Sequence, residues 1–170
     1  MTIDFIDKVE LVLGKIKDEE LLLLKGHLFI EELISETLKK QFGEDTVNKL
    51  RLSFENKFIL FCSITGLKKD SEQYQSIIKI NQMRNKLAHR LDISLKKDFI
   101  ELIKIYNDYI PKTINRKLTF LNSIKKIFFG LLAYLHGYTR AQLMIKDRNK
   151  YILSKKHPEL ENEFWDSYEM

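Results

Sequence analysis

Apolar residues recur every three or four positions along almost the whole chain, which is the period of an amphipathic α-helix. The first such stretch is residues 3–16, where the apolar positions are Ile3, Ile6, Val9, Leu13 and Ile16. No stretch combines alternating apolar residues with turn signals in the way that paired strands require. The sequence therefore predicts an all-α fold, a bundle of about six or seven helices.

Residues that start and stop helices divide this pattern. Asp18 is an expected N-cap of a long second helix that ends near Gly43, and Ser53 opens another helix that Gly66 stops. The expected helices are 3–16, 18–43, 44–51, 53–66, 71–89, 94–110 and 115–150, the last one interrupted or bent near Gly130 or Gly137. Gly26 costs about 1 kcal/mol relative to Ala inside a helix, so we expect close packing to require it.

The length of 170 residues is that of one domain with a substantial core, so we expect a single domain over 1–170. The lone Cys62 excludes a disulfide framework and a Cys-based zinc cluster, and its apolar neighbours indicate a buried thiol. Acidic residues near the N-terminus argue against a targeting peptide. The longest apolar run, 127–135, is far shorter than the roughly 20 residues of a membrane span. We expect a cytoplasmic protein that does not enter a membrane.

Charge is distributed unevenly along the chain. Residues 1–110 hold 18 basic and 18 acidic side chains, whereas 111–156 hold 11 basic side chains and one acidic one, Asp147. Residues 157–170 form an acidic tail with five acidic side chains. The long basic C-terminal helix can attract phosphate backbones, with Lys125, Lys126 and Arg140 as candidate RNA-binding residues; a solvated helix face is the alternative.

The stretch QMRNKLAHRLD, residues 82–92, places polar residues in an unusual pattern at the end of an expected helix. At 100° per residue, Met83, Leu87 and Leu91 form a core stripe with Arg84 on its edge. Asn85 and His89 share the opposite face with Ile78, which suggests that a second surface docks there. Two alternatives stay open: Arg84 extends past the core to water or a carboxylate, and His89 interacts with the helix dipole.

The motif MRNKLAH resembles the Arg-x4-His signature of the HEPN superfamily, in its form with Asn directly after Arg. The segments HLFIEELISETLKKQFG (27–43) and LSFENKFILFCSITGL (52–67) are similar to the preceding helices of mannitol-repressor-like members. The resemblance covers about residues 20–110. It implies a helical bundle that dimerises, with the Arg and His residues of both protomers gathered at the dimer cleft.

The resemblance implies a metal-independent endoribonuclease, acting as a toxin or in phage defence. The motif residues carried over by position are Arg84, Asn85 and His89. RNA supplies its own nucleophile, the 2′-OH, so no cofactor or metal is expected; His89 transfers protons and Arg84 holds the phosphate. The implied partners are RNA, a second copy of the chain and a cognate antitoxin protein.

The sequence departs from the family pattern, and these departures leave other functions open. Toxins controlled by a nucleotidyltransferase antitoxin carry Tyr two residues after the His, where this chain has Leu91. Some members, including mannitol-repressor-like regulators, keep the fold without cleaving RNA, so a silent interaction module is the alternative. A DNA-binding repressor ranks last, since no helix-turn-helix is evident. The isolated histidines His27, His136 and His157 are expected at the surface or in the core. Glu31 and Glu32 are expected on a solvated helix face, with the lining of a cleft as the alternative. Tyr134 and Tyr138 are expected in helix packing, with stacking on RNA bases beside Arg140 as the alternative.

Overall fold

The computed structural model describes residues 4–89, 94–107 and 119–156. This part of the chain contains seven helices and no strand, which confirms the expected all-α bundle. In chain order they are α1 (Phe5–Leu13), α2 (Glu19–Phe42), α3 (Glu44–Leu50), α4 (Phe54–Thr65), α5 (Glu72–His89), α6 (Lys96–Asn107) and α7 (Phe120–Lys156).

The predicted helix boundaries between α2 and α4 are confirmed in detail. The Asp18 carboxylate accepts a hydrogen bond of 2.7 Å from the Leu21 N–H, and Ser53 Oγ accepts one of 3.3 Å from the Asn56 N–H. Each side chain thus satisfies a backbone donor that the first helical turn leaves unpaired. Gly43 and Gly66 follow the two helices with φ of 86° and 74°, a backbone region that favours glycine.

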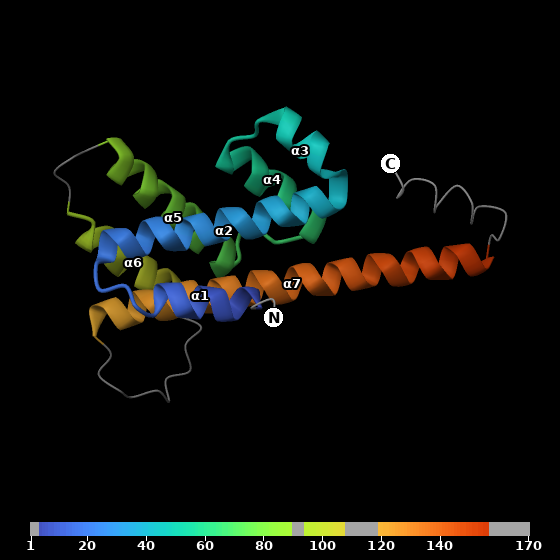
Figure 1. Ribbon diagram of the computed structural model, residues 1–170. Coiled ribbons are helices and arrows are strands. Elements are labelled where there is room, and N and C mark those ends of the chain that lie inside the picture. Colours follow the sequence, from blue (N-terminus) through green and yellow to red (C-terminus); the bar gives the residue numbers. More distant parts are fainter. Residues whose placement is uncertain (1–3, 90–93, 108–118, 157–170) are drawn as a thin grey trace. The chain divides into compact units, whose positions relative to one another are not determined.

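The long helix α2 lies at the centre of the bundle and packs against α1, α3, α4 and α5 (Figure 1). At Gly26, α2 also meets α7. A Cβ atom built on Gly26 would overlap the ring of Phe128, which is fully buried. Close packing of a core ring against the backbone therefore requires this glycine, as the sequence suggested.

A charged cluster joins α5 to α6. Lys79, which is only 9% exposed, donates hydrogen bonds to Asp98 (2.8 Å) and to Glu101, and Lys86 donates a second bond to Asp98 (2.7 Å). Burial alone would lower the pKa of Lys79, but these carboxylates raise it above its ordinary value. The buried ammonium therefore stays charged and ties the two helices together.

The first and last helices differ from their predicted bounds. α1 ends at Leu13, yet Ile16 beyond it is buried all the same. α7 runs without interruption through Gly130 and Gly137 and ends at Lys156, six residues beyond the predicted end. The expected helical residues 3, 108–110 and 115–118, the segment 90–93 and the acidic tail 157–170 lie outside the described residues. None of the described helices contains a stretch long and apolar enough to cross a membrane.

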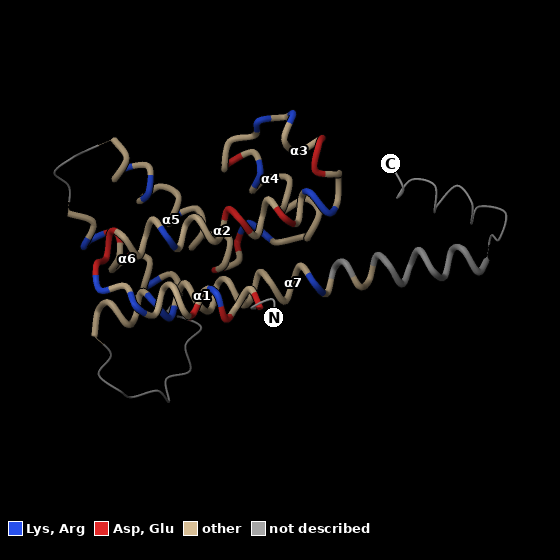
Figure 2. Tube along the Cα trace, in the orientation of Figure 1, with Lys and Arg blue, Asp and Glu red and all other residues tan. Residues whose placement is uncertain are grey.

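The chain divides into two compact units, Met1–Leu135 and His136–Met170. The expectation of a single domain over 1–170 stays a prediction. Helices α1 to α6 belong to the first unit, where Lys and Arg positions are interspersed with Asp and Glu positions (Figure 2). This mixture agrees with the balanced charge of residues 1–110.

Candidate functional site

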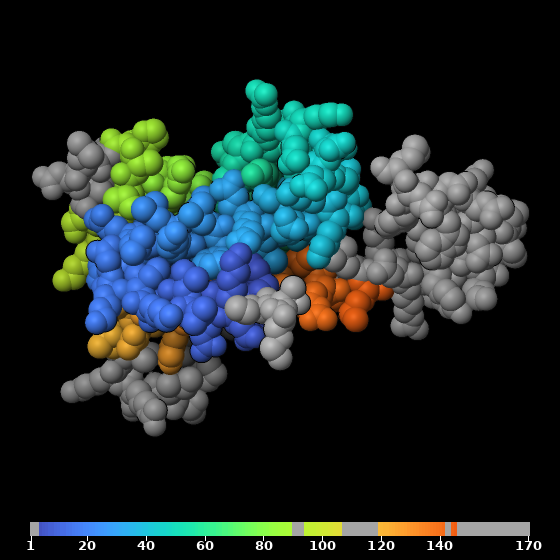
Figure 3. Space-filling view, viewed as in Figure 1, coloured from blue at the N-terminus to red at the C-terminus, as the bar shows by residue number. Residues whose placement is uncertain are grey.

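A cavity of about 350 Å³ lies where α5 meets α2 and the start of α4. In Figure 3 it corresponds to the hollow between α5 and the α3–α4 segment, with α2 as its floor. We call it the arginine cavity. Its lining residues come from three parts of the chain: His27, Glu31, Leu52, Ser53, Phe54, Glu55, Asn81, Arg84 and Asn85.

Two of the three predicted catalytic residues line this cavity together. Arg84 Nη1 donates a hydrogen bond of 3.2 Å to Asn85 Oδ1, and both side chains are exposed. Of the predicted core stripe, Met83 is fully buried, Leu87 is half-buried and packs against the core, and Leu91 lies outside the described residues. Among the described residues no carboxylate forms an ion pair with Arg84. Its guanidinium is therefore available to a ligand.

The third predicted catalytic residue lies elsewhere. His89 is the last residue of α5, is exposed, and does not line the arginine cavity. Ile78, which shares its predicted face, is half-buried and packs against the core of the same chain. Contacts within the chain therefore explain the apolar side chain of Ile78, and no second protein surface is needed for it. Dimerisation stays a prediction.

His27, expected to be structural or solvated, is buried but also forms part of the cavity wall. Its Nε2 lies 3.1 Å from Asn81 Oδ1, and its ring packs 4.4 Å from the ring of Phe54, centroid to centroid. Burial lowers the pKa of His27 below 6.5, and the charge of Arg84 acts in the same direction. The imidazole is therefore neutral at neutral pH and donates from Nε2 to Asn81.

The opposite wall carries two carboxylates, Glu31 of α2 and Glu55 of α4, and Lys57 lies just outside the lining. Lys57 Nζ donates a hydrogen bond of 2.9 Å to Glu31, which the sequence had also left as a solvated residue. Ser53, Phe54 and Glu55 form the N-terminal end of α4, where unpaired N–H groups and the helix dipole favour an anion. Lys57 neutralises Glu31, which leaves Glu55 as the one carboxylate of the lining without an ion pair among the described residues. The guanidinium of Arg84 and the helix terminus are the groups of this cavity that suit a phosphate.

The predicted RNA-binding residues have different surroundings. Lys125 Nζ donates a hydrogen bond of 2.6 Å to the backbone carbonyl of Gly14, so it satisfies the C-terminal end of α1. Lys126, in the same unit, is exposed; Arg140, in the second unit, is exposed as well. Only Lys126 and Arg140 therefore present free charge in the way that the prediction requires.

The other reactive groups of the described residues are a half-buried cysteine and side chains too scattered to bind a metal. The thiol of Cys62, expected to be buried, is half-buried, and this burial raises its pKa to about 11. Within residues 4–89, 94–107 and 119–156, no group of three His, Cys, Asp or Glu side chains is placed to hold a metal ion. No protein-family model, curated protein or solved structure matches this chain.

Proposed function

We propose that this protein is a HEPN-type, metal-independent endoribonuclease that acts in the cytoplasm as a toxin or phage-defence component. The observation that supports the proposal best is the arginine cavity. It presents an unpaired guanidinium, Arg84, beside the amide of Asn85 and the N-terminus of α4. These groups are suited to a phosphate that gains negative charge as it reacts.

In the proposed reaction the 2′-oxygen of RNA attacks the adjacent phosphorus and the bond from phosphorus to the 5′-oxygen breaks. Arg84 stabilises the charge on the phosphoryl oxygens and Asn85 holds Arg84 in place. His89 accepts the 2′-OH proton or protonates the leaving 5′-oxygen. The products are a 2′,3′-cyclic phosphate and a 5′-OH end.

Because His89 does not line the arginine cavity, the proposed reaction depends on how two copies of the chain assemble. Arg84 and His89 lie about 140° apart around α5 when each residue turns the helix by 100°. A two-fold axis beside α5 would bring His89 of one protomer to the phosphate held by the other. The proposal therefore requires a homodimer, and a cognate antitoxin would act by blocking this cleft.

The experiment is cleavage of single-stranded RNA in EDTA at pH 6–8, with solution mass measured by light scattering. His89→Ala is expected to lower the rate by about 10²- to 10⁴-fold, as loss of an acid–base group does. Arg84→Lys keeps the charge and loses the planar fork, so we expect a large loss there too. Gln82→Ala, an exposed α5 position outside the cavity lining, is the matched control. Circular dichroism verifies folding.

A second candidate function, a silent interaction module, is favoured by one observation. Leu21, Leu24 and Leu28 form a stripe on α2 and are 44%, 38% and 55% exposed. Exposed leucines in one row suit a protein partner. Wild-type protein that leaves varied RNAs intact, or folded His89→Ala protein that cleaves as fast as wild type, would replace the nuclease proposal with this one.

A further inference from the structure

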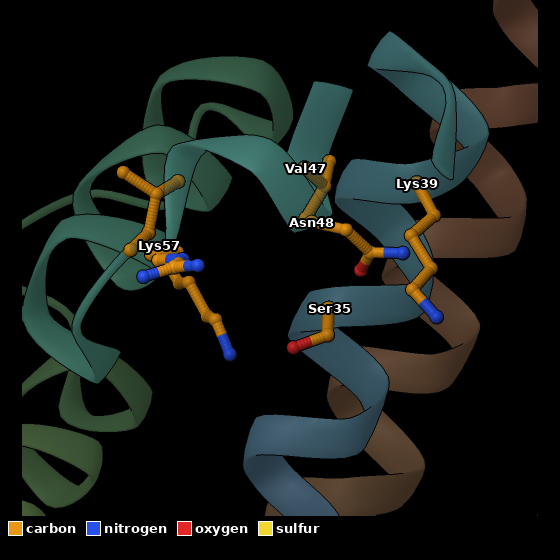
Figure 4. Close-up of a pocket in the computed structure, with 7 residues that line it drawn as sticks. Ser35, Lys39, Val47, Asn48 and Lys57 are labelled. Atoms are coloured by element: carbon orange, nitrogen blue, oxygen red, sulfur yellow. The ribbon is translucent and has the colours of Figure 1, made fainter. Parts of the chain in front are cut away.

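A second cavity of about 310 Å³ lies between α2, α3 and α4, and we call it the basic cavity. Figure 4 shows four of its lining residues, Ser35 and Lys39 on α2, Asn48 on α3 and Lys57 on α4. The full lining consists of Ser35, Lys39, Val47, Asn48, Arg51, Leu52 and Lys57. It contains three cationic side chains and no carboxylate.

Two of these cations have acidic partners outside the lining. Lys39 lies 3.6 Å from Glu36 and 3.1 Å from Glu44, carboxylates that are 55% and 68% exposed, and Lys57 pairs with Glu31 at 2.9 Å. Ion pairs with carboxylates as exposed as these are weak, because water and salt screen them. A dianionic or strongly hydrogen-bonding ligand can therefore take over the ammonium group of Lys39 at small cost.

Arg51 is held in the cavity lining by an unusual backbone conformation. With φ of 45° and ψ of 44°, it is the one non-glycine residue of positive φ in the described part of the chain. Left-handed backbone costs a residue with a Cβ roughly 1–2 kcal/mol. Within the described ranges Arg51 has no ion-pair partner. An arginine is thus maintained, unpaired, where glycine would be less strained.

The two cavities adjoin each other along α2. Leu52 lines both, and the ion pair between Lys57 and Glu31 joins a residue of the basic cavity to one of the arginine cavity. The α2 residues that line them follow at intervals of four: His27, Glu31, Ser35 and Lys39. At 1.5 Å per residue this row extends for about 18 Å, the scale of a few nucleotides.

We propose that the basic cavity binds a second phosphate of the RNA strand whose scissile phosphate lies at Arg84. That the ligand is RNA rests on the proposed function. The cavity and its cationic lining do not depend on that function. Arg51 forms the charge-assisted contact, Lys39 and Lys57 add positive charge, and Ser35 and Asn48 donate neutral hydrogen bonds. The strand follows the row of α2 residues from one cavity to the other.

The test is binding of a fluorescent, non-cleavable 2′-O-methyl RNA 12-mer, measured by anisotropy between 50 and 300 mM salt. Arg51→Gln is expected to weaken binding about tenfold at low salt. It is also expected to reduce the slope of log affinity against log salt by about 0.7, the value for one phosphate contact on a single strand. Lys49→Gln, an exposed α3 residue outside the lining, is the matched control.

Arg51→Gly separates the charge from the backbone conformation, because glycine accepts positive φ without strain. We expect it to melt no lower than wild type and to bind RNA as weakly as Arg51→Gln. Affinity and salt slope equal to those of Lys49→Gln in both variants would overturn the proposal. So would tight binding of AMP that displaces the 12-mer, since the cavity would then belong to a small phosphorylated molecule.

The cleavage assay distinguishes this inference from the proposed function. Arg51-dependent binding by a protein that cleaves no RNA would support the basic cavity and overturn the nuclease. Cleavage that depends on Arg84 and His89, with RNA affinity independent of Arg51, would overturn the basic cavity alone. If both hold, Arg51→Gln raises KM and leaves kcat near the wild-type value.

Discussion

Lys57 donates a hydrogen bond of 2.9 Å to Glu31, although the two residues line different cavities. Both are partly buried, with side-chain exposures of 19% and 31%. The pair therefore affects the electrostatic potential of both cavities. Glu31 lowers the positive potential of the basic cavity, and Lys57 neutralises a carboxylate that lines the arginine cavity with Arg84.

Glu31→Gln is expected to release Lys57 and to raise the affinity for the 2′-O-methyl RNA 12-mer about threefold at low salt, the scale of a modest ion pair. Glu32→Gln is the control, because Glu32 pairs with Lys8 and lines neither cavity. An equal gain in RNA affinity in the two variants would show that only the net charge of the protein matters. It would exclude a specific role of the pair of Lys57 and Glu31.

Lys125→Met is expected to lower the free energy of unfolding by about 1 kcal/mol, because the Gly14 carbonyl at the end of α1 loses its donor. Lys126→Met, at the next and more exposed position, is expected to change stability by less than about 0.5 kcal/mol. Urea titrations compare the two. If Lys126→Met is the more destabilising change, the hydrogen bond of Lys125 has no stabilising role.

Asp98→Asn is expected to destabilise the protein by about 2 kcal/mol, the scale of hydrogen bonds to charged groups. Burial opposes ionisation of Asp98, but Lys79 and Lys86 hold its pKa below the ordinary value of 3.8. The unfolded chain therefore takes up this proton at a higher pH than the folded chain. The free energy of unfolding of the wild type should therefore fall as pH drops through about 4 and below. The Asp98→Asn variant should lack the contribution of Asp98 to this decrease, as thermal melts recorded from pH 2.5 to 6 can show.

His27→Gln is expected to flatten the dependence of stability on pH just below neutrality. Since burial lowers the pKa of His27, the unfolded state binds its proton first as pH falls below about 6.5. Wild-type stability should therefore decrease from pH 7 to 5, and the glutamine variant should lose this slope while keeping a hydrogen bond to Asn81. Identical slopes in urea titrations of both proteins would contradict the assigned burial of His27.

Gly26→Ala is expected to cost about 1–3 kcal/mol, the range for overpacking a core, because the new methyl group overlaps the ring of Phe128. Gly137→Ala is the matched control: nothing lies within 4 Å of its added Cβ, so it should stabilise α7 by up to about 1 kcal/mol. Phe128→Leu should recover part of the loss in Gly26→Ala. Thermal melts that rank the two alanine variants alike would refute the contact.

Much of the fold could be predicted from the sequence because the signals are local. Asp18, Ser53, Gly43 and Gly66 act on their own helix ends, and the structure has them there. The buried face of α2 was beyond such reasoning. Leu21, Leu24 and Leu28 make one apolar stripe and Leu22, Leu23 and Ile30 another; only the second is buried, because the neighbouring helices pack there.

The candidate site likewise includes residues that could be predicted from the sequence and residues that could not. Arg84 and Asn85 were candidates because the motif MRNKLAH resembles a family signature, and the structure places both in one cavity. His27 was missed as a member of that cavity because its partner, Asn81, is 54 positions away. A signal existed in the spacing of His27 and Glu31, which puts both on one face of α2 a single turn apart. The backbone conformation of Arg51 had no sequence signal that we recognise.

The hydrogen bond from Lys125 to Gly14 has a consequence for how the chain folds. It joins residues 111 positions apart, whereas Lys79 and Asp98, which tie α5 to α6, are 19 apart. Closing a long loop costs more chain entropy than closing a short one, and contacts of high sequence separation slow folding. We therefore expect α5 and α6 to pair early, and α7 to dock against α1 in the rate-limiting step.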